Sequence, residues 1–219
     1  VAALTDFHPL LLMPWGSDIL VGPNESPELR ALIKFTINQA DLITCDCEEV
    51  KRQIQIICNE YLSENIVVFP WGIDLSLFNP QRNSSRIDEE LGWDNNKVLI
   101  MTRALKPIYG IEYFLKSLPE VIEREPSVRV LMVGDGPIKN DLLSLVSSLN
   151  LTEHIIFVGS VDNNDLVNYL NFADIYVTTS LSDGSSLSLL EAMACGLPVV
   201  VSDIPANREW VEDGLNGYI

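Results

Sequence analysis

The chain has 219 residues, of which 47% are hydrophobic and 8% aromatic, enough apolar material for one large domain or two small ones. Its 31 acidic residues against 14 basic ones give a net charge of -17, which repels both the phosphate backbone of nucleic acids and an anionic bilayer surface. No segment approaches the roughly 18 consecutive apolar residues of a membrane-spanning helix, and residues 1–14 lack the features of a signal peptide. We therefore expect a soluble globular protein that does not bind nucleic acid.

The first part of the chain alternates short apolar runs with amphipathic stretches. The pattern predicts strands at 9–14, 41–45 and 65–70, and helices near 26–39 and 46–62. The front of the chain, "HPLLLMP", has the composition of a buried strand. The periodicity then breaks at "PWGIDLSLFNPQRNSSRIDEELG", whose prolines, glycine and polar cluster are typical of a linker.

From Lys97 onward the same alternation is longer and more regular. It predicts strands at 97–102, 128–133, 154–159, 174–180 and 198–202, and helices at 110–124, 137–149, 163–172, 186–195 and 206–213. The closing "GLNGYI" has the pattern of a turn that enters another strand. Because the strands are apolar on both alternations, we expect helices on both faces of a parallel sheet. The sequence thus predicts two α/β domains, at 1–74 and 97–219, joined by a linker at 75–96.

The four cysteines show no spacing that suggests a disulfide or a zinc site. Cys45 and Cys47 are too close for an easy mutual disulfide, and Cys58 and Cys195 fall in helical patterns. We expect reduced, structural thiols and hence a cytoplasmic location.

The loops that follow the strands are the places to search for function, because ligands of open α/β sheets lie at the carboxyl ends of the strands. After the strand at 97–102, "TRALKPIYG" places Arg103 directly at the strand end and Lys106 three residues later. A guanidinium at this position can bind a phosphate bidentately. An ordinary solvated charge explains Arg103 equally well.

Two further loops are rich in glycine. In "VGDGP", Gly134 and Gly136 flank Asp135 and would allow close approach of a backbone before Pro137 opens a helix, although a plain tight turn is the simpler interpretation. In "VGSVDNND", Gly159 supplies open main-chain groups able to pair with a base edge, a weak signal when taken alone.

The loop "LSDGSSLSLLEAMACGLP" leads into a helix with Ser185 or Ser186 as its N-cap. The unpaired N–H groups and the positive dipole at that helix start form an anion site suited to a diphosphate. The small residues at 184–186 leave room for such a ligand to approach.

Asp183 and Glu191 lie on either side of this helix start. At about 1.5 Å of rise per residue their carboxylates should be on the order of 10 Å apart, which suits a ligand with hydroxyls on both sides of a central diphosphate, such as a nucleotide sugar. A capping box formed by Ser188 and Glu191 is an equally good explanation of Glu191.

The stretch "DGSSLSLLEAMACGLPVVVSDIPANREWVEDGLNGYI" resembles the donor-binding segment of the retaining GT-B glycosyltransferases of family four. "VLMVGDGP", "HIIFVGSV", "YLNFADIYVTTS" and the Arg of "MTRALKPIYG" agree with the same family. "NIVVFPWGIDLSLFNP" resembles its interdomain linker, and "PWGSDIL" and "ADLITCDCEEVKRQI" resemble the end of its acceptor domain. The resemblance implies two Rossmann-like, doubly wound parallel-sheet domains, both incomplete in this chain.

The resemblance also implies roles for particular residues. Glu191 would bind the ribose hydroxyls, Asp183 would contact the transferred sugar, and Arg103 would neutralise the departing diphosphate. Further donor contacts would come from Lys106, Gly134, Gly136, Gly159, Gly184, Ser185, Ser186, Leu187 and Gly16.

The implied reaction moves a sugar from a nucleotide-diphosphate sugar to a glycan or lipid-linked acceptor. It proceeds with retention of configuration, without a metal ion or other cofactor, in polysaccharide or glycolipid assembly. We expect any peripheral membrane contact to be made by parts of the protein outside this chain.

Three positions depart from the usual pattern of the family. Asp183 stands where a longer acidic side chain is usual, Tyr109 stands in place of a Lys before Gly110, and Trp15 stands where many members have His. These departures leave open a catalytically inactive nucleotide-sugar-binding subunit. A GT-B sugar-nucleotide epimerase, which would share the fold and the nucleotide site, is a second alternative.

Overall fold

The computed structural model describes residues 2–5, 7–58, 63–80, 87, 91–93 and 95–219. The chain divides into two compact units. The first comprises Val1–Gly72, Ser182–Ser186 and Ile204–Trp210, and the second comprises Ile73–Leu181, Leu187–Asp203 and Val211–Ile219. The domain boundaries predicted from the sequence, at residues 74 and 97, stay predictions.

The first unit contains a three-stranded parallel sheet with the order β1-β2-β3. Its strands are β1 (Leu11–Leu12), β2 (Leu42–Cys45) and β3 (Ile66–Val68). Its helices are α1 (Ser17–Leu20), α2 (Pro27–Asn38), α3 (Glu48–Cys58) and α9 (Pro205–Arg208), with short 3-10 turns η1 (Ala2–Leu4), η2 (Gly22–Asn24) and η3 (Ser63–Asn65). The predicted strands and helices are all present, and the end of the helix expected at 46–62 lies outside the described residues.

The start of α2 illustrates how the sequence sets these elements. Ser26 is extended and its hydroxyl accepts a hydrogen bond from the Leu29 N–H over 3.1 Å, while Pro27 occupies the first helical position. The expectation of a buried first strand was wrong for Leu11, whose side chain is 51% exposed. Among the described residues β1 is an edge strand only two residues long, so few neighbours cover it.

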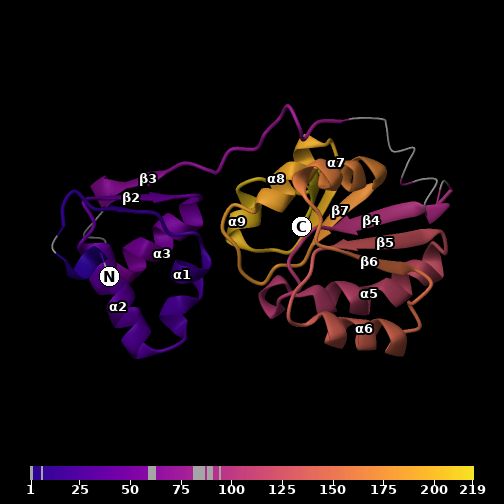
Figure 1. Ribbon diagram of the computed structural model, residues 1–219, viewed down its shortest axis with the longest axis horizontal. Coiled ribbons are helices and arrows are strands. Elements are labelled where there is room, and N and C mark those ends of the chain that lie inside the picture. Colours follow the sequence, from indigo (N-terminus) through magenta and orange to yellow (C-terminus); the bar gives the residue numbers. More distant parts are fainter. Residues whose placement is uncertain (1, 6, 59–62, 81–86, 88–90, 94) are drawn as a thin grey trace. The chain divides into compact units, whose positions relative to one another are not determined.

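The second unit is built on a six-stranded parallel sheet with the order β6-β5-β4-β7-β8-β9. The strands are β4 (Lys97–Met101), β5 (Val128–Val133), β6 (Ile155–Gly159), β7 (Ile175–Thr178), β8 (Val199–Val201) and β9 (Gly217–Tyr218). The helices are α5 (Ile111–Arg124), α6 (Lys139–Ser148), α7 (Asn163–Phe172) and α8 (Leu187–Ala194), with the 3-10 turn η4 (Pro107–Tyr109). Figure 1 shows α5 and α6 on one side of this sheet and α7 and α8 on the other. The predicted α/β class with a parallel sheet is confirmed.

Helices on both faces explain why the strands are apolar throughout. In β5, Val130, Leu131 and Met132 are consecutive, so their side chains point to alternate faces, yet each is at most 1% exposed. On one face, Val130 and Met132 pack with Leu115 and Leu118 of α5 in one hydrophobic core cluster.

The helix expected at 206–213 is much shorter than predicted. It ends at Arg208 because the next two N–H groups bond to carbonyl oxygens three residues back, as in a 3-10 turn. Glu209 donates to Ala206 and Trp210 donates to Asn207. The following residues turn into β9, as the pattern of "GLNGYI" predicted.

All four cysteines are free and buried. Burial raises the pKa of the Cys45 and Cys195 thiols to about 11 and that of Cys47 to about 12. These thiols are therefore protonated at neutral pH, which agrees with the predicted structural role. Separately, none of the helices in the described part of the chain is both long and apolar enough to cross a membrane.

The order of the strands reverses beside β4. From β4 the chain proceeds outward through β5 and β6, and it then returns to place β7 on the opposite side of β4, with Leu99 paired to Ile175. Such a reversal opens a crevice at the carboxyl ends of the two strands, so ligands of this fold type bind beside the loops that follow β4 and β7.

Candidate functional site

The loops that follow β4 and β7 are hydrogen-bonded to each other. The Thr179 hydroxyl lies 3.1 Å from the carbonyl oxygen of Tyr109 and 3.0 Å from that of Gly110. The Leu181 N–H donates to the carbonyl oxygen of Ile108 over 2.9 Å. The two sides of the switch point are thus connected at the edge where a ligand is expected.

Arg103 lies in the first of these loops, and its guanidinium contacts one aromatic ring and one hydroxyl. Its guanidinium carbon is 3.9 Å from the centroid of the Tyr109 ring. Its Nη1 donates to the Ser188 Oγ over 2.8 Å, and the Tyr176 hydroxyl donates to the same oxygen over 3.0 Å. The interpretation of Arg103 as an ordinary solvated charge is therefore wrong, because its side chain is fixed against α8 and η4.

The capping-box interpretation of Glu191 is also wrong. A capping box needs Ser188 as the N-cap, but α8 begins at Leu187, so Ser188 lies inside the helix. The Ser188 hydroxyl is engaged by Arg103 and Tyr176 instead. Ser186 directly precedes Leu187, in agreement with one of the two predicted N-caps.

Glu191 lies in the second turn of α8, and its charge interacts with that of Arg103. Burial raises the pKa of its carboxyl to about 7, while the positive charge of Arg103 acts in the opposite direction. Arg103 and Glu191, two of the charged side chains predicted for the donor site in this unit, therefore interact electrostatically.

This raised pKa makes stability depend on pH. Because the folded pKa of Glu191, about 7, exceeds the ordinary 4.5, the folded state binds this proton more tightly, and the stabilisation present below pH 4.5 is lost as pH rises through 7. We expect wild-type chain to lose about 2–3 kcal/mol of unfolding free energy from this group between pH 5 and pH 8. Glu191→Gln should remove that loss in denaturant titrations, whereas the exposed Glu123→Gln should not. Equal pH profiles for wild type and Glu191→Gln would contradict the assignment.

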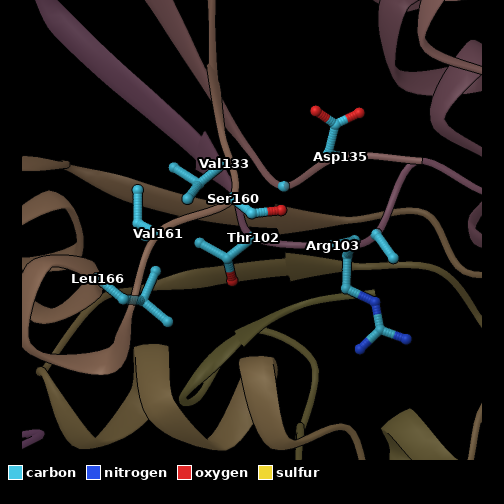
Figure 2. Close-up of a pocket in the computed structure, with 9 residues that line it drawn as sticks. Thr102, Arg103, Val133, Asp135, Ser160, Val161 and Leu166 are labelled. Atoms are coloured by element: carbon cyan, nitrogen blue, oxygen red, sulfur yellow. The ribbon is translucent and has the colours of Figure 1, made fainter.

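A cavity of about 220 Å³ lies beside Arg103 in the second unit. It is lined by Thr102, Arg103, Ala104, Val133, Gly134, Asp135, Ser160, Val161 and Leu166. Figure 2 shows apolar side chains of this set and Thr102 on one side, with the Arg103 guanidinium extending away from them. The volume is below the roughly 300–1,000 Å³ of sites for whole small molecules, so it suits one part of a nucleotide.

Thr102 and Ser160 line this cavity but were not predicted from the sequence. The Thr102 Oγ1 is buried, and no group in the described part of the chain hydrogen-bonds to it. Nothing in the sequence distinguishes these two hydroxyls from those of other strand-end residues. Among the described residues, no three His, Cys, Asp or Glu side chains are grouped as metal ligands would be.

The glycines of "VGDGP" are needed for contact with the neighbouring loop. A Cβ on Gly134 would lie less than 3.0 Å from the carbonyl oxygen of Arg103, and one on Gly136 would lie as close to that of Leu105. The Leu105 N–H also donates to the Asp135 carbonyl over 3.0 Å. The close backbone approach is thus to residues 103–105, and a contact of either glycine with a donor stays a prediction.

Two other predicted donor contacts have definite places. Gly159 ends β6 with φ +87°, and its carbonyl accepts a hydrogen bond from the Gly134 N–H over 2.8 Å, so this group is already engaged. Lys106 precedes η4 and its side chain is exposed. The side chain that contacts the Arg103 guanidinium belongs to Tyr109 rather than to Lys106.

The small residues at 184–186 belong to the first unit. A Cβ on Gly16 would lie 3.2 Å from the Gly184 nitrogen, so the two predicted glycines are adjacent. The Ser185 N–H donates to Asp46 Oδ2 over 2.9 Å, and its hydroxyl donates to the Asp46 carbonyl over 2.7 Å. Asp46 is 3% exposed, and burial raises the pKa of its carboxyl. No motif in the sequence points to this role of Asp46.

The remaining predicted residues lie close by in the sequence. Asp183 is half-buried in the first unit, Ser186 is buried, and Leu187 is 43% exposed at the start of α8. Glu191 belongs to the second unit, so the separation of about 10 Å expected between its carboxylate and that of Asp183 stays a prediction.

The family model described as "Glycosyl transferases group 1" matches residues 83–219 of this sequence. The chain belongs to the glycosyl transferases group 1 family. The match confirms the family predicted from the motifs and includes Arg103, Ser188 and Glu191.

Relatives of this group 1 chain are glycosyltransferases with different named donors. It is 34% identical over 159 residues to the UDP-Gal:alpha-D-GlcNAc-diphosphoundecaprenol alpha-1,3-galactosyltransferase of Escherichia coli, covering 70% of the chain and 41% of the relative. It is 27% identical over 207 residues to the GDP-mannose-dependent alpha-(1-6)-phosphatidylinositol monomannoside mannosyltransferase of Mycolicibacterium smegmatis, covering 91% and 54%. The chain thus spans about half the length of these relatives.

Solved structures of other proteins share the fold of this chain. HepE of Anabaena, solved in complex with UDP-glucose, matches with a TM-score of 0.87 at 24% identity, covering 99% of this chain and 60% of that one. Sucrose-phosphate synthase of Thermosynechococcus elongatus matches with a TM-score of 0.79 at 21% identity, covering 96% and 54%. The predicted GT-B fold is confirmed.

Proposed function

We propose that this group 1 chain belongs to an enzyme that transfers a sugar from a nucleotide-diphosphate sugar to a glycan or lipid-linked acceptor, with retention of configuration and without a metal ion. The observation that carries the proposal is the Arg103 guanidinium at the switch point, bonded to Ser188 in the first turn of α8 and accompanied by Glu191. A fixed positive charge beside a helix start is suited to a diphosphate.

In this proposal the bond between the anomeric carbon and the diphosphate oxygen breaks, and an acceptor hydroxyl oxygen bonds to the same face of that carbon. The proton of that hydroxyl passes to the departing diphosphate. Arg103 stabilises the negative charge that develops on the departing diphosphate. Glu191 accepts hydrogen bonds from the ribose hydroxyls, and Asp183 contacts the transferred sugar. Since the pKa of Glu191 is raised to about 7, its carboxylate form predominates only above about pH 7.

The proposal assigns the remaining donor contacts to nine further residues of the two units. They are Lys106, Gly134, Gly136, Gly159, Gly184, Ser185, Ser186, Leu187 and Gly16. The cavity between Thr102 and Leu166 would receive the base. A cytoplasmic location and a place in polysaccharide or glycolipid assembly are part of the same proposal.

The names of the relatives leave the base of the donor undecided. The E. coli relative is named for UDP-Gal and the M. smegmatis relative for GDP-mannose. A thermal-shift screen of the chain should therefore include uridine, guanosine and adenosine diphosphates. At a concentration about 100 times the Kd, the matching diphosphate should add about 2.7 kcal/mol and raise Tm by roughly 5–10 °C.

Glu191→Ala should abolish most of that shift, and the exposed Glu123→Ala should leave it unchanged. No shift with any diphosphate would count against a donor site. Epimerised nucleotide sugar as the only product would favour the epimerase, and donor binding without turnover for any acceptor would favour an inactive binding subunit.

A further inference from the structure

The guanidinium of Arg103 contacts both an aromatic ring and a hydroxyl of fixed position. Its Cζ lies 3.9 Å from the centroid of the Tyr109 ring, and its Nη1 lies 2.8 Å from the Ser188 Oγ. That hydroxyl also accepts from Tyr176, whose side chain is fully buried. The position of the guanidinium is therefore determined by two independent contacts.

Tyr109 is itself held by its backbone and by its ring. Its N–H donates to the Lys106 carbonyl over 3.1 Å, and its own carbonyl lies 3.1 Å from the Thr179 hydroxyl. Its ring packs against the core cluster that includes Ile111 and Phe114 of α5. A ring anchored in this way can fix the group that lies over it.

We propose that Tyr109 is a positioning residue that orients Arg103 for phosphate recognition, an inference that rests on the function proposed above. An arginine side chain loses many rotamers when it binds a phosphate bidentately. The ring attracts the cation and covers one of its faces, so the guanidinium already has a binding orientation before the ligand arrives. Because Tyr109 adds no positive charge, its effect on affinity depends on Arg103.

Tyr113 provides a matched control on α5. Lys116 Nζ lies 5.6 Å from the centroid of its ring, so it forms the same class of interaction. The Tyr113 side chain is 55% exposed, and Tyr113 does not line the cavity beside Arg103. A tyrosine substitution here reports the loss of a cation–π contact that has no part in the proposed site.

The test uses calorimetric titration of the chain with the nucleoside diphosphate found in the thermal screen and with the corresponding nucleoside. Tyr109→Leu should lower the affinity for the diphosphate by about 5- to 30-fold and the affinity for the nucleoside by less than about twofold. Tyr109→Phe keeps the ring and should stay within about twofold of wild type for both ligands. Tyr113→Leu should change neither. Equal weakening of both ligands by Tyr109→Leu would overturn the proposal, because it would indicate a general structural role.

A double-mutant cycle with Arg103→Met tests whether Tyr109 acts through Arg103. In the Arg103→Met background, Tyr109→Leu should cause no further loss of diphosphate affinity. A full additional loss there would overturn the proposal. If wild type binds no nucleoside diphosphate, the proposed function fails; if Arg103→Met weakens binding and Tyr109→Leu does not, this inference alone fails.

A measurement on wild type covers the case in which Tyr109→Leu does not fold. Protons of a guanidinium over an aromatic face are shifted upfield by the ring current. In NMR spectra of the ligand-free 24.4 kDa chain, the Arg103 Nε–H and Cδ protons should be shifted upfield relative to those of the exposed Arg124. Arg103 shifts equal to those of Arg124 would overturn the proposal.

Discussion

Arg103→Met is expected to weaken nucleoside diphosphate binding by about 10- to 100-fold while leaving the affinity for the nucleoside within about twofold. A bidentate, charge-assisted contact to a phosphate contributes roughly 1.5–3 kcal/mol, and Met removes it while retaining an unbranched apolar side chain. Arg103→Lys should recover only part of the loss, because an ammonium has neither the planar fork nor the flat face that lies over Tyr109. Calorimetric titration of the folded variants measures each affinity.

Arg124 is the matched control for this substitution. It lies near the end of α5, its side chain is 78% exposed, and it pairs with Glu120 on the same helix. Arg124→Met removes an equal charge and should leave diphosphate affinity unchanged. A loss for Arg124→Met as large as that for Arg103→Met would indicate that the net charge of the chain, rather than the contact, governs binding.

Gly134→Ala is expected to destabilise the chain by about 3 kcal/mol or more. Gly134 has φ +139°, a region that residues with a Cβ rarely adopt, and the added methyl would meet the carbonyl oxygen and carbon of Arg103. Because the neighbours are backbone atoms, the loop after β4 would have to shift rather than a side chain rotate. Thermal unfolding should show a decrease in Tm on the order of 6–12 °C.

Gly214→Ala separates the two causes of this loss. Gly214 also has a positive φ, +77°, but apart from Gly214 itself and its two chain neighbours no described atom lies within 4 Å of the position of an added Cβ. It should cost only about 1 kcal/mol from backbone strain. If the two variants lose the same stability, close packing between the loops after β4 and β5 does not account for the effect.

The strands were predictable because their chemistry is local. Each central strand of the second unit is a continuous apolar run, and β5 was found at the predicted residues, 128–133. Arg103 and Glu191 were predictable as candidates because they follow strands in a fold whose ligands lie at strand ends. The contact of Arg103 with Ser188 of α8, and its charge interaction with Glu191, depend on the order of the strands, which places β7 beside β4.

The rest depended on contacts between residues far apart in the sequence. The pattern at Ser188 fitted a capping box as well as a site, and only the position of the helix start and the hydrogen bond from Arg103 decided between them. Tyr109 stood out only as a departure from a family pattern, and the orientation of its ring is not encoded in any local signal.

The hydrogen bonds from Thr179 and Leu181 to the turn at Pro107–Tyr109 have a consequence for how fast and how strongly a ligand binds. Loops that are hydrogen-bonded to each other in this way lose their conformational entropy when the chain folds rather than when the ligand arrives. Binding at this edge should then resemble lock-and-key association, with a single kinetic phase and no slow rearrangement after the encounter.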